Sequence, residues 1–326
     1  MRAIIAVMVF ILALLAIWYS GGNSDFDGVA YVEKQTGSSL DSQLVDVGEV
    51  NLHVVFAGPA DGEPIILIHG FPQFWYLWRH HISMLAEAGY RVAAPDLRGF
   101  NRSDKPAGKA AYEFKDFARD IIGLMDSQQW ANANVVGHDI GARVTWQLIF
   151  DAPERISRAV VVSVGHPLAF EAATGESDVS WYRTFLQLPL IPEFFSRVGG
   201  LSFLANTFRG EGMESSFSEE DIEIYKKAWD RDHAFDSMIG VYSHFDAVID
   251  TIPQDGVPSM PVLFLYGLGD VYISNEVALG TKQYLSEQHV KIYPKLSHWL
   301  LEEDPEMTGR EILDFISEGI GPSTSF

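Results

Sequence analysis

Continuous apolar runs alternate with helical patterns along most of the chain, and this alternation constrains the fold more than any other feature. Runs typical of buried strands lie at 64–69, 90–95, 133–137, 159–163, 262–266 and 290–293. Helical patterns at 73–88, 114–129 and 142–151 separate the first four of them. Strands that are apolar on both faces and joined by helices predict right-handed crossovers and a sheet with both faces covered. The sequence therefore predicts an α/β protein with a mostly parallel, doubly wound sheet.

The alternation breaks after residue 165 and resumes near residue 251. Between them the sequence is helical and aromatic, without buried strand runs. Two short alternating segments before residue 64 predict two further strands. We therefore predict a core in two parts, 45–165 and 251–326, with a helical cap inserted at 166–250 after the sixth strand. A polar linker at 23–44 precedes the core. A chain of 326 residues with 47% hydrophobic content can bury a core of this size.

The N-terminal segment 1–22 forms a separate module, predicted to be a hydrophobic helix. Arg2 precedes an uncharged apolar run at 3–19, and acidic residues follow it. About 17 apolar residues are the short end of a bilayer span, and no Ala-x-Ala cleavage signal follows them. We expect an uncleaved anchor that places residues 3–19 in the lipid bilayer and the bulk of the chain outside the cytoplasm. The alternative is a cleaved signal peptide and a secreted or periplasmic protein.

Composition excludes several classes of function. The formal net charge of −21 disfavours a nucleic-acid partner, whose phosphates it would repel. The absence of cysteine excludes disulfides and thiolate chemistry. Neither HExxH nor a tight cluster of metal-ligand spacing occurs, and no glycine-rich loop suits a phosphate. We predict no metal and no cofactor; the oligomeric state does not follow from these features.

One turn places an aspartate where a nucleophile would be exposed. The strand at 133–137 leads into Gly137-His138-Asp139-Ile140-Gly141, and a helical pattern follows. Gly-x-Asp-x-Gly has the form of the tight strand-to-helix turn Gly-x-Ser-x-Gly, in which bulky neighbours do not fit. A carboxylate is ionised at neutral pH and can attack without a base. It suits displacement at a saturated carbon, such as an epoxide or a carbon–halogen bond.

Two further candidate residues follow strands at the same edge of the predicted sheet. Asp270 follows the strand at 262–266, and His298 follows the strand at 290–293. Ligands of open α/β sheets bind outside the carboxyl ends of the strands. We predict that Asp139 is the nucleophile, that His298 is a general base, and that Asp270 orients His298.

From about residue 45 onward the chain resembles the epoxide hydrolase and dehalogenase branch of the α/β-hydrolase superfamily. The motifs that carry the resemblance are His-Gly-Phe-Pro at 69–72, the segment 96–106, Gly-His-Asp-Ile-Gly-Ala at 137–142, Asp270 and His298-Trp299. Nucleophile, acid and histidine also follow one another in the order of that superfamily. The resemblance implies an oxyanion hole made by the backbone N–H groups of Phe71 and Ile140.

Two cap tyrosines favour the epoxide hydrolases within this branch. Tyr182 and Tyr242 stand at places that match the tyrosines that epoxide hydrolases hold over the nucleophile. Opening an epoxide generates an alkoxide, which needs hydrogen bonds and then a proton. The resemblance thus implies hydrolysis of epoxides to vicinal diols through an alkyl ester of Asp139. The alternative for both tyrosines is packing within an aromatic cap.

The predicted substrate is small, hydrophobic and uncharged, because aromatic side chains dominate the candidate pocket. The predicted pocket residues are Phe71, Trp75, Arg143, Trp181 and Trp299.

A haloacid dehalogenase of the fluoroacetate type, using the same triad, is the alternative function. Ile140 stands where haloalkane dehalogenases carry a tryptophan for the halide. Fluoroacetate dehalogenases carry arginine at the first and fourth positions after the nucleophile, and only the fourth, Arg143, is present here. Arg143 either binds substrate or pairs with a carboxylate beneath the turn.

Overall fold

The computed structural model describes residues 28–173, 185–188, 191–192, 201–209, 216–244 and 249–318. The segment predicted as an anchor, 1–22, and the cap residues Trp181 and Tyr182 lie outside this described part. Within it, no helix combines the length and the apolar character that a membrane crossing requires.

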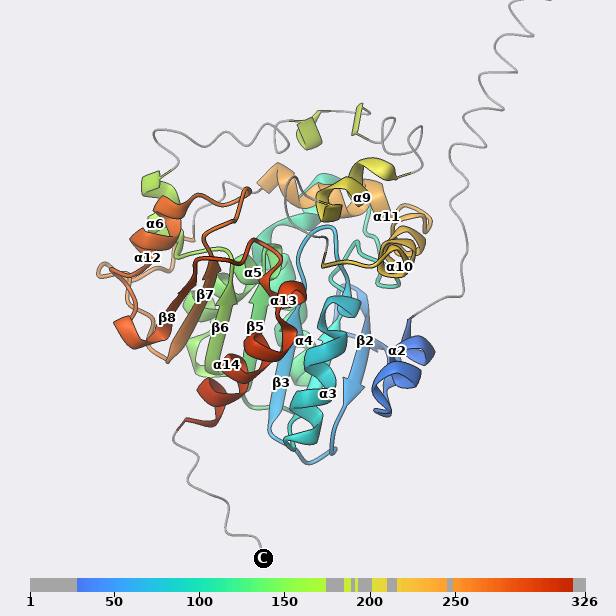
Figure 1. Cartoon of the computed structure of the whole chain (residues 1–326), viewed down its shortest axis with the longest axis horizontal. Coiled ribbons are helices and arrows are strands. Elements are labelled where there is room, and N and C mark those ends of the chain that lie inside the picture. The colour runs from blue at the N-terminus through green and yellow to red at the C-terminus, as the bar shows by residue number, and fades with distance from the viewer. Residues whose placement is uncertain are drawn as a thin grey trace, which may run out of the picture.

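An eight-stranded sheet forms the centre of the molecule (Figure 1). Its spatial order is β1-β2-β4-β3-β5-β6-β7-β8. Only the pairs β1–β2 and β2–β4 are antiparallel, and the other neighbours are parallel. The strands are β1 (Asp41–Asp46), β2 (Asn51–Ala57), β3 (Pro64–Ile68), β4 (Arg91–Pro95), β5 (Ala133–His138), β6 (Ile156–Val162), β7 (Val262–Gly267) and β8 (Val290–Tyr293). The predicted α/β fold with a mostly parallel sheet is confirmed.

Helices cover both faces of the sheet, which is why the central strands are apolar throughout. On one face α3 (Arg79–Glu87) packs against α14 (Pro305–Ser317), and on the other α4 (Phe114–Ser127) packs against α5 (Ile140–Asp151) (Figure 1). The remaining helices around the core are α2 (Val29–Thr36), α6 (Pro167–Ala173), α12 (Asn275–Thr281) and α13 (Leu300–Glu303). Short 3₁₀ turns are η1 (Trp75–Trp78), η2 (Lys109–Tyr112), η3 (Pro153–Arg155), η4 (Ile239–His244) and η5 (Glu287–His289).

Helices inserted between β6 and β7 gather at one end of the sheet (Figure 1). Three of them are α9 (Ser202–Arg209), α10 (Glu219–Trp229) and α11 (Ala234–Met238). They meet the core through aromatic rings: Phe208 of α9 and Phe217 both pack edge-on against Trp299, which follows β8. Helix α6 also falls in the predicted cap range, but it packs against α12 of the core.

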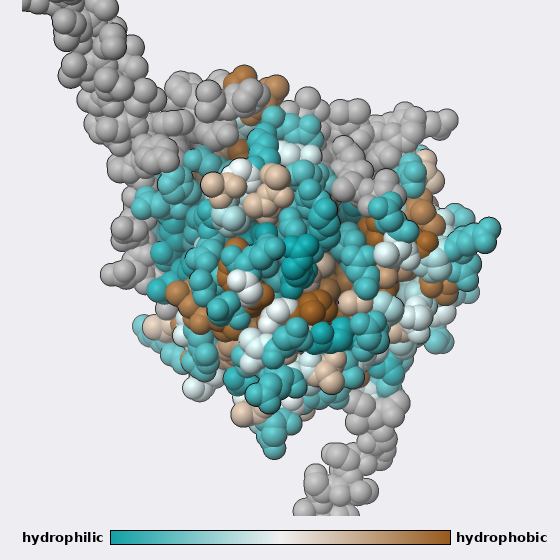
Figure 2. All heavy atoms as spheres, turned by 180° about the vertical axis from the view of Figure 1, so that it is seen from behind, coloured by the Kyte–Doolittle hydropathy of each residue, from teal (hydrophilic) through white to brown (hydrophobic). Residues whose placement is uncertain are grey.

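The face turned away from the viewer of Figure 1 is mostly hydrophilic where the structure describes it. Figure 2 shows that face, where hydrophilic side chains predominate and hydrophobic ones form small patches.

Candidate active site

Asp139 stands in a strained turn between β5 and α5. Its φ of 54° and ψ of −117° are a conformation that residues with a side chain rarely adopt. A Cβ on Gly137 would lie 2.2 Å from the carbonyl oxygen of Gly141, and one on Gly141 would lie 2.2 Å from that of Ile68. Both glycines are therefore required by the close approach of strand and helix. The turn places the carboxylate of Asp139 beyond the carboxyl ends of the strands.

The structure brings Asp139, His298 and Asp270 together. His298 Nδ1 lies 2.7 Å from Asp270 Oδ2, and His298 Nε2 lies 3.5 Å from Asp139 Oδ2. Side-chain exposure falls along this row from 15% for Asp139 to 3% for His298 and 0% for Asp270. The carboxylate that can meet a ligand is thus the one in the strained turn.

The buried carboxylate of Asp270 is held on both oxygens. Its Oδ1 accepts the backbone N–H groups of Tyr272 at 2.7 Å and Ile273 at 2.9 Å, while Oδ2 faces His298. The ring of Tyr272 packs edge-on against His298, with 5.0 Å between centroids, and its hydroxyl donates to the carbonyl of Thr207 in α9. This loop therefore fixes one side of the imidazole and contacts the cap.

The His-Gly-Phe-Pro turn after β3 lies against the carboxylate of Asp139. The Phe71–Pro72 peptide bond is cis, and the Phe71 N–H donates to Asp139 Oδ1 at 2.8 Å. A Cβ on Gly70 would lie 2.4 Å from Asp139 Cβ, so the turn approaches the carboxylate closely because residue 70 is glycine. Ile140 is the first residue of α5, and its amide is one of the first-turn N–H groups without a partner inside a helix.

The protonation states of Asp139 and His298 are coupled. Burial alone would lower the pKa of His298, but the charge of Asp270 and the hydrogen bonds to Asp139 and Asp270 raise it to about 10. Burial would raise the pKa of Asp139, but the hydrogen bond and the charge of His298 outweigh it and lower the pKa. The resting site therefore holds an ionised Asp139 beside a protonated His298.

Two residues that the sequence analysis did not single out contact the main chain of His298. His138 Nε2 lies 3.0 Å from the carbonyl oxygen of His298, and Ser163 Oγ donates to the same oxygen at 3.1 Å. Ser163 directly follows β6, so its place at the carboxyl end of a strand was the available signal.

Tyr242, one of the two tyrosines predicted over Asp139, lies beside the His-Gly-Phe-Pro turn. It belongs to η4, is buried, and packs its ring edge-on against Phe71 with 5.1 Å between centroids. Its carbonyl accepts a hydrogen bond from the side chain of Gln187 at 2.9 Å.

The other predicted pocket residues differ in their surroundings. Trp299 packs edge-on against His298 at 4.9 Å between centroids and joins the cap aromatics. Trp75 is fully buried, and its backbone N–H donates to Asp96 Oδ1 at 3.0 Å. Arg143 is buried on α5 with its guanidinium 5.0 Å from the centre of the Phe114 ring.

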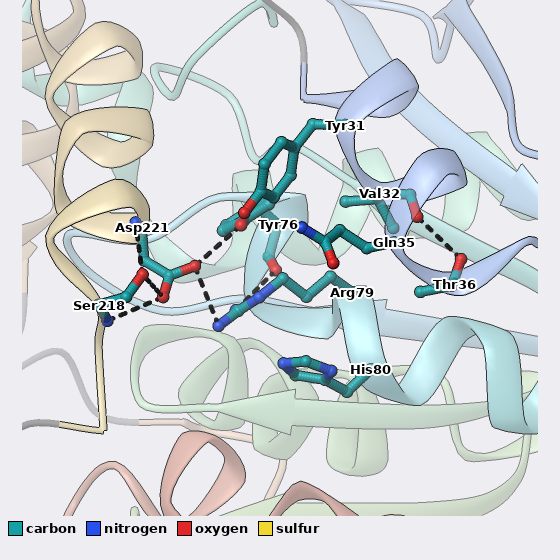
Figure 3. Close-up of a pocket in the computed structure, with 9 residues that line it drawn as sticks. All are labelled: Tyr31, Val32, Gln35, Thr36, Tyr76, Arg79, His80, Ser218 and Asp221. Carbon is teal, nitrogen blue, oxygen red and sulfur yellow. Dashed lines mark hydrogen bonds and ion pairs between the residues drawn. The ribbon is translucent and has the colours of Figure 1, made fainter.

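A second polar network joins the cap to the core away from the triad. Arg79 of α3 forms two hydrogen bonds to Glu302 of α13, at 2.8 and 2.7 Å, and lies 3.3 Å from Asp221 of α10. Figure 3 shows Asp221 pointing toward Arg79 and the hydroxyl of Tyr76, at the edge of a cavity of about 190 Å³ that Tyr31 of α2 also lines. Among the described residues no group of three or more side chains could hold a metal ion.

The fold and this site define an α/β hydrolase class in which a carboxylate occupies the nucleophile turn. A family model described as the alpha/beta hydrolase fold matches residues 63–305. The chain belongs to the α/β-hydrolase family.

Relatives and solved structures agree with this assignment. The AB hydrolase superfamily protein YfhM of Bacillus subtilis is 33% identical over 278 residues, which are 84% of this chain and 97% of that protein. Epoxide hydrolase 2 of Caenorhabditis elegans is 28% identical over 322 residues, 94% of this chain and 89% of that protein. The crystal structure of epoxide hydrolase VrEH1 from Vigna radiata superposes with a TM-score of 0.73 at 27% identity, covering 86% of this chain and 98% of that one.

Proposed function

We propose that this protein is an epoxide hydrolase that converts small, uncharged, hydrophobic epoxides to vicinal diols. One observation carries the proposal: an ionised carboxylate, Asp139, replaces serine in the nucleophile turn, 3.5 Å from a histidine that a buried aspartate orients. A carboxylate attacks a saturated carbon and leaves an ester that water can hydrolyse. The names of the Caenorhabditis elegans and Vigna radiata relatives support the same reaction.

The first step is alkylation of the enzyme. Asp139 Oδ2 attacks the less hindered epoxide carbon while Oδ1 stays bound to the Phe71 N–H. The carbon–oxygen bond of the ring breaks, and Tyr182 and Tyr242 hydrogen-bond the developing alkoxide, one of them donating a proton. The product of this step is an alkyl ester of Asp139.

The second step is hydrolysis of that ester. Esterification removes the negative charge of Asp139, so one of the interactions that raise the pKa of His298 is lost. His298 gives up the proton that it held at rest, through solvent, to the phenolate left by the first step. The neutral imidazole then takes a proton from water, and the hydroxide attacks the ester carbonyl carbon of Asp139. The N–H groups of Phe71 and Ile140 hold the oxyanion before the diol leaves.

An isotope experiment tests the covalent scheme. With excess enzyme and styrene oxide in ¹⁸O-water, one turnover should label Asp139 and leave the diol unlabelled, because the transferred oxygen comes from the carboxylate. Asp139→Asn should form no diol. Label that enters the diol in the first turnover would contradict the ester intermediate. Halide release from fluoroacetate, without diol from epoxides, would instead establish the haloacid dehalogenase.

Tyr242 gives a test of the cap. Tyr242→Phe should lower the rate of alkylation about 100-fold, the lower end of what a positioned proton donor contributes. Tyr225→Phe is a matched control, because the Tyr225 hydroxyl lies in the network of Gln73 and Glu302. Single-turnover rates with styrene oxide should be near wild type for Tyr225→Phe; equal rates for both variants would exclude Tyr242 as the donor.

We further propose that residues 3–19 anchor the enzyme in a membrane with its catalytic domain outside the cytoplasm. The apolar run and the preceding Arg2 support this topology. The full chain, expressed in bacteria, should stay in the membrane fraction after alkaline carbonate washing, whereas a chain starting at residue 23 should not. A soluble mature protein shortened at its N-terminus would instead establish a cleaved signal peptide.

A further inference from the structure

Ser163 stands out because it combines a strained backbone with complete burial. It follows β6, has a φ of 70° and is 0% exposed. This left-handed region favours glycine or asparagine, and a serine there is held only by its surroundings. Its N–H donates to the carbonyl of Leu265 in β7 at 2.9 Å, so the neighbouring strand fixes the residue.

The hydroxyl of Ser163 is aimed at the residue that carries the base. It donates to the backbone carbonyl of His298 at 3.1 Å, across 135 positions of the chain. The conformation at Ser163 is what points the side chain of this β6-end residue toward the loop after β8.

A second donor meets the same carbonyl. His138 Nε2 lies 3.0 Å from it. Because a carbonyl oxygen only accepts, Nε2 carries the hydrogen, and burial together with the nearby His298 lowers the pKa of His138 to about 3, so the ring is neutral. One atom of His298 is thus tied to the residue before Asp139 and to the end of the next strand.

We propose that Ser163 is a positioning residue for the hydrolysis of the alkyl ester, acting through the main chain of His298. The inference rests on the proposed function. The imidazole has to keep its 3.5 Å separation from Asp139 so that it can direct a water at the ester carbonyl. Ring opening uses Asp139 and the cap phenols and does not require His298 as a base. Loss of the Ser163 hydroxyl therefore slows the second step and spares the first.

Three substitutions separate the hydroxyl from the backbone strain. Ser163→Ala removes the donor and keeps the strain, and Ser163→Gly removes the donor and relieves the strain. Ser163→Asn tolerates the left-handed conformation and supplies an amide donor. We expect ester hydrolysis to be about tenfold slower for Ala and Gly, as for one lost hydrogen bond, while alkylation is unchanged. Ser163→Asn should restore the wild-type rate of ester hydrolysis.

The measurement is rapid quenching with styrene oxide in excess, followed by intact-protein mass and diol analysis. The Ala and Gly variants should accumulate alkyl-enzyme, with kcat and KM falling together and kcat/KM unchanged. A merely structural role predicts that activity follows stability, so Gly, the more stable variant, would then match wild type and overturn the proposal. Equal alkyl-enzyme levels in wild type and Ala would also overturn it. Wild-type enzyme that forms neither ester nor diol would refute the proposed function itself.

Discussion

His298 lies between two carboxylates, and the charge on one of them changes during the proposed reaction. Asp270 is fully buried and keeps its contact with Nδ1, whereas Asp139 faces Nε2 and loses its charge on esterification. Burial opposes a proton on His298, and the two carboxylates outweigh it. In the proposed reaction, alkylation is therefore the event that turns His298 from a resting cation into a base.

Asp139→Asn tests this coupling at the residue level. The substitution removes a negative charge, so the pKa of His298 should fall below the value of about 10 that Asp139 and Asp270 together support. NMR titration of ¹⁵N-histidine-labelled protein measures it directly. Asp139→Glu is the control, because it keeps the charge. A His298 pKa that is the same in Asp139→Asn as in wild type would show that Asp270 alone holds the proton.

The triad candidates were predictable because each follows a strand run in the printed sequence. Ser163 and His138 also follow or end strands, but their effect lies in hydrogen bonds to a carbonyl oxygen 135 and 160 positions away. Every residue type carries a backbone carbonyl, so the sequence does not indicate which carbonyl a side chain will bind. The contacts of Ser163 and His138 with His298 could therefore not be predicted from the sequence.

At the scale of elements, the cap helix α10 is attached to the core through a buried charge network. Arg79 of α3 faces Glu302 of α13 and Asp221 of α10, and the Tyr225 hydroxyl donates to Glu302 at 3.4 Å. Because α13 begins two residues after His298, the same contacts brace the loop that carries His298.

Arg79→Met should destabilise the protein by about 3–5 kcal/mol, because it leaves the buried Glu302 without its partner. Arg119→Met is the matched control: Arg119 is 52% exposed, pairs with Glu49 and Asp116, and should cost less than about 1 kcal/mol. Urea unfolding measures both. Adding Glu302→Leu to Arg79→Met should recover most of the loss, and equal losses for the two single variants would mean that the network contributes little.

Strand positions followed from the apolar runs more closely than helix bounds followed from periodicity. The helical pattern at 73–88 becomes the 3₁₀ turn η1 and then α3, which starts at Arg79. All four residues of η1 are buried against the core, so this stretch has no polar face that would indicate a helical period. Tertiary contacts of this kind are not contained in a local pattern.

At the scale of the whole molecule, the folded state buries several histidines in neutral form. Four of them are fully buried: His69, His81, His138 and His166. Burial lowers the pKa of each, to about 3 for His81 and His138 and to about 4 for His166. The unfolded chain would protonate all four near pH 6.5.

Stability should therefore fall steeply as the pH drops from about 6.5 toward 4. Below 6.5 the unfolded state binds more protons than the folded state. Each histidine whose pKa lies at about 3 or 4 costs about 1.4 kcal/mol per pH unit, on the order of 4 kcal/mol per pH unit for His81, His138 and His166 together. His298 acts in the opposite sense: its raised pKa gives a contribution that is complete below 6.5 and lost as the pH rises through about 10. Urea unfolding at pH 7, 6 and 5 measures the slope, and His81→Gln should reduce it by about one proton. A free energy of unfolding that stays constant from pH 7 to 5 would contradict the neutral burial of these rings.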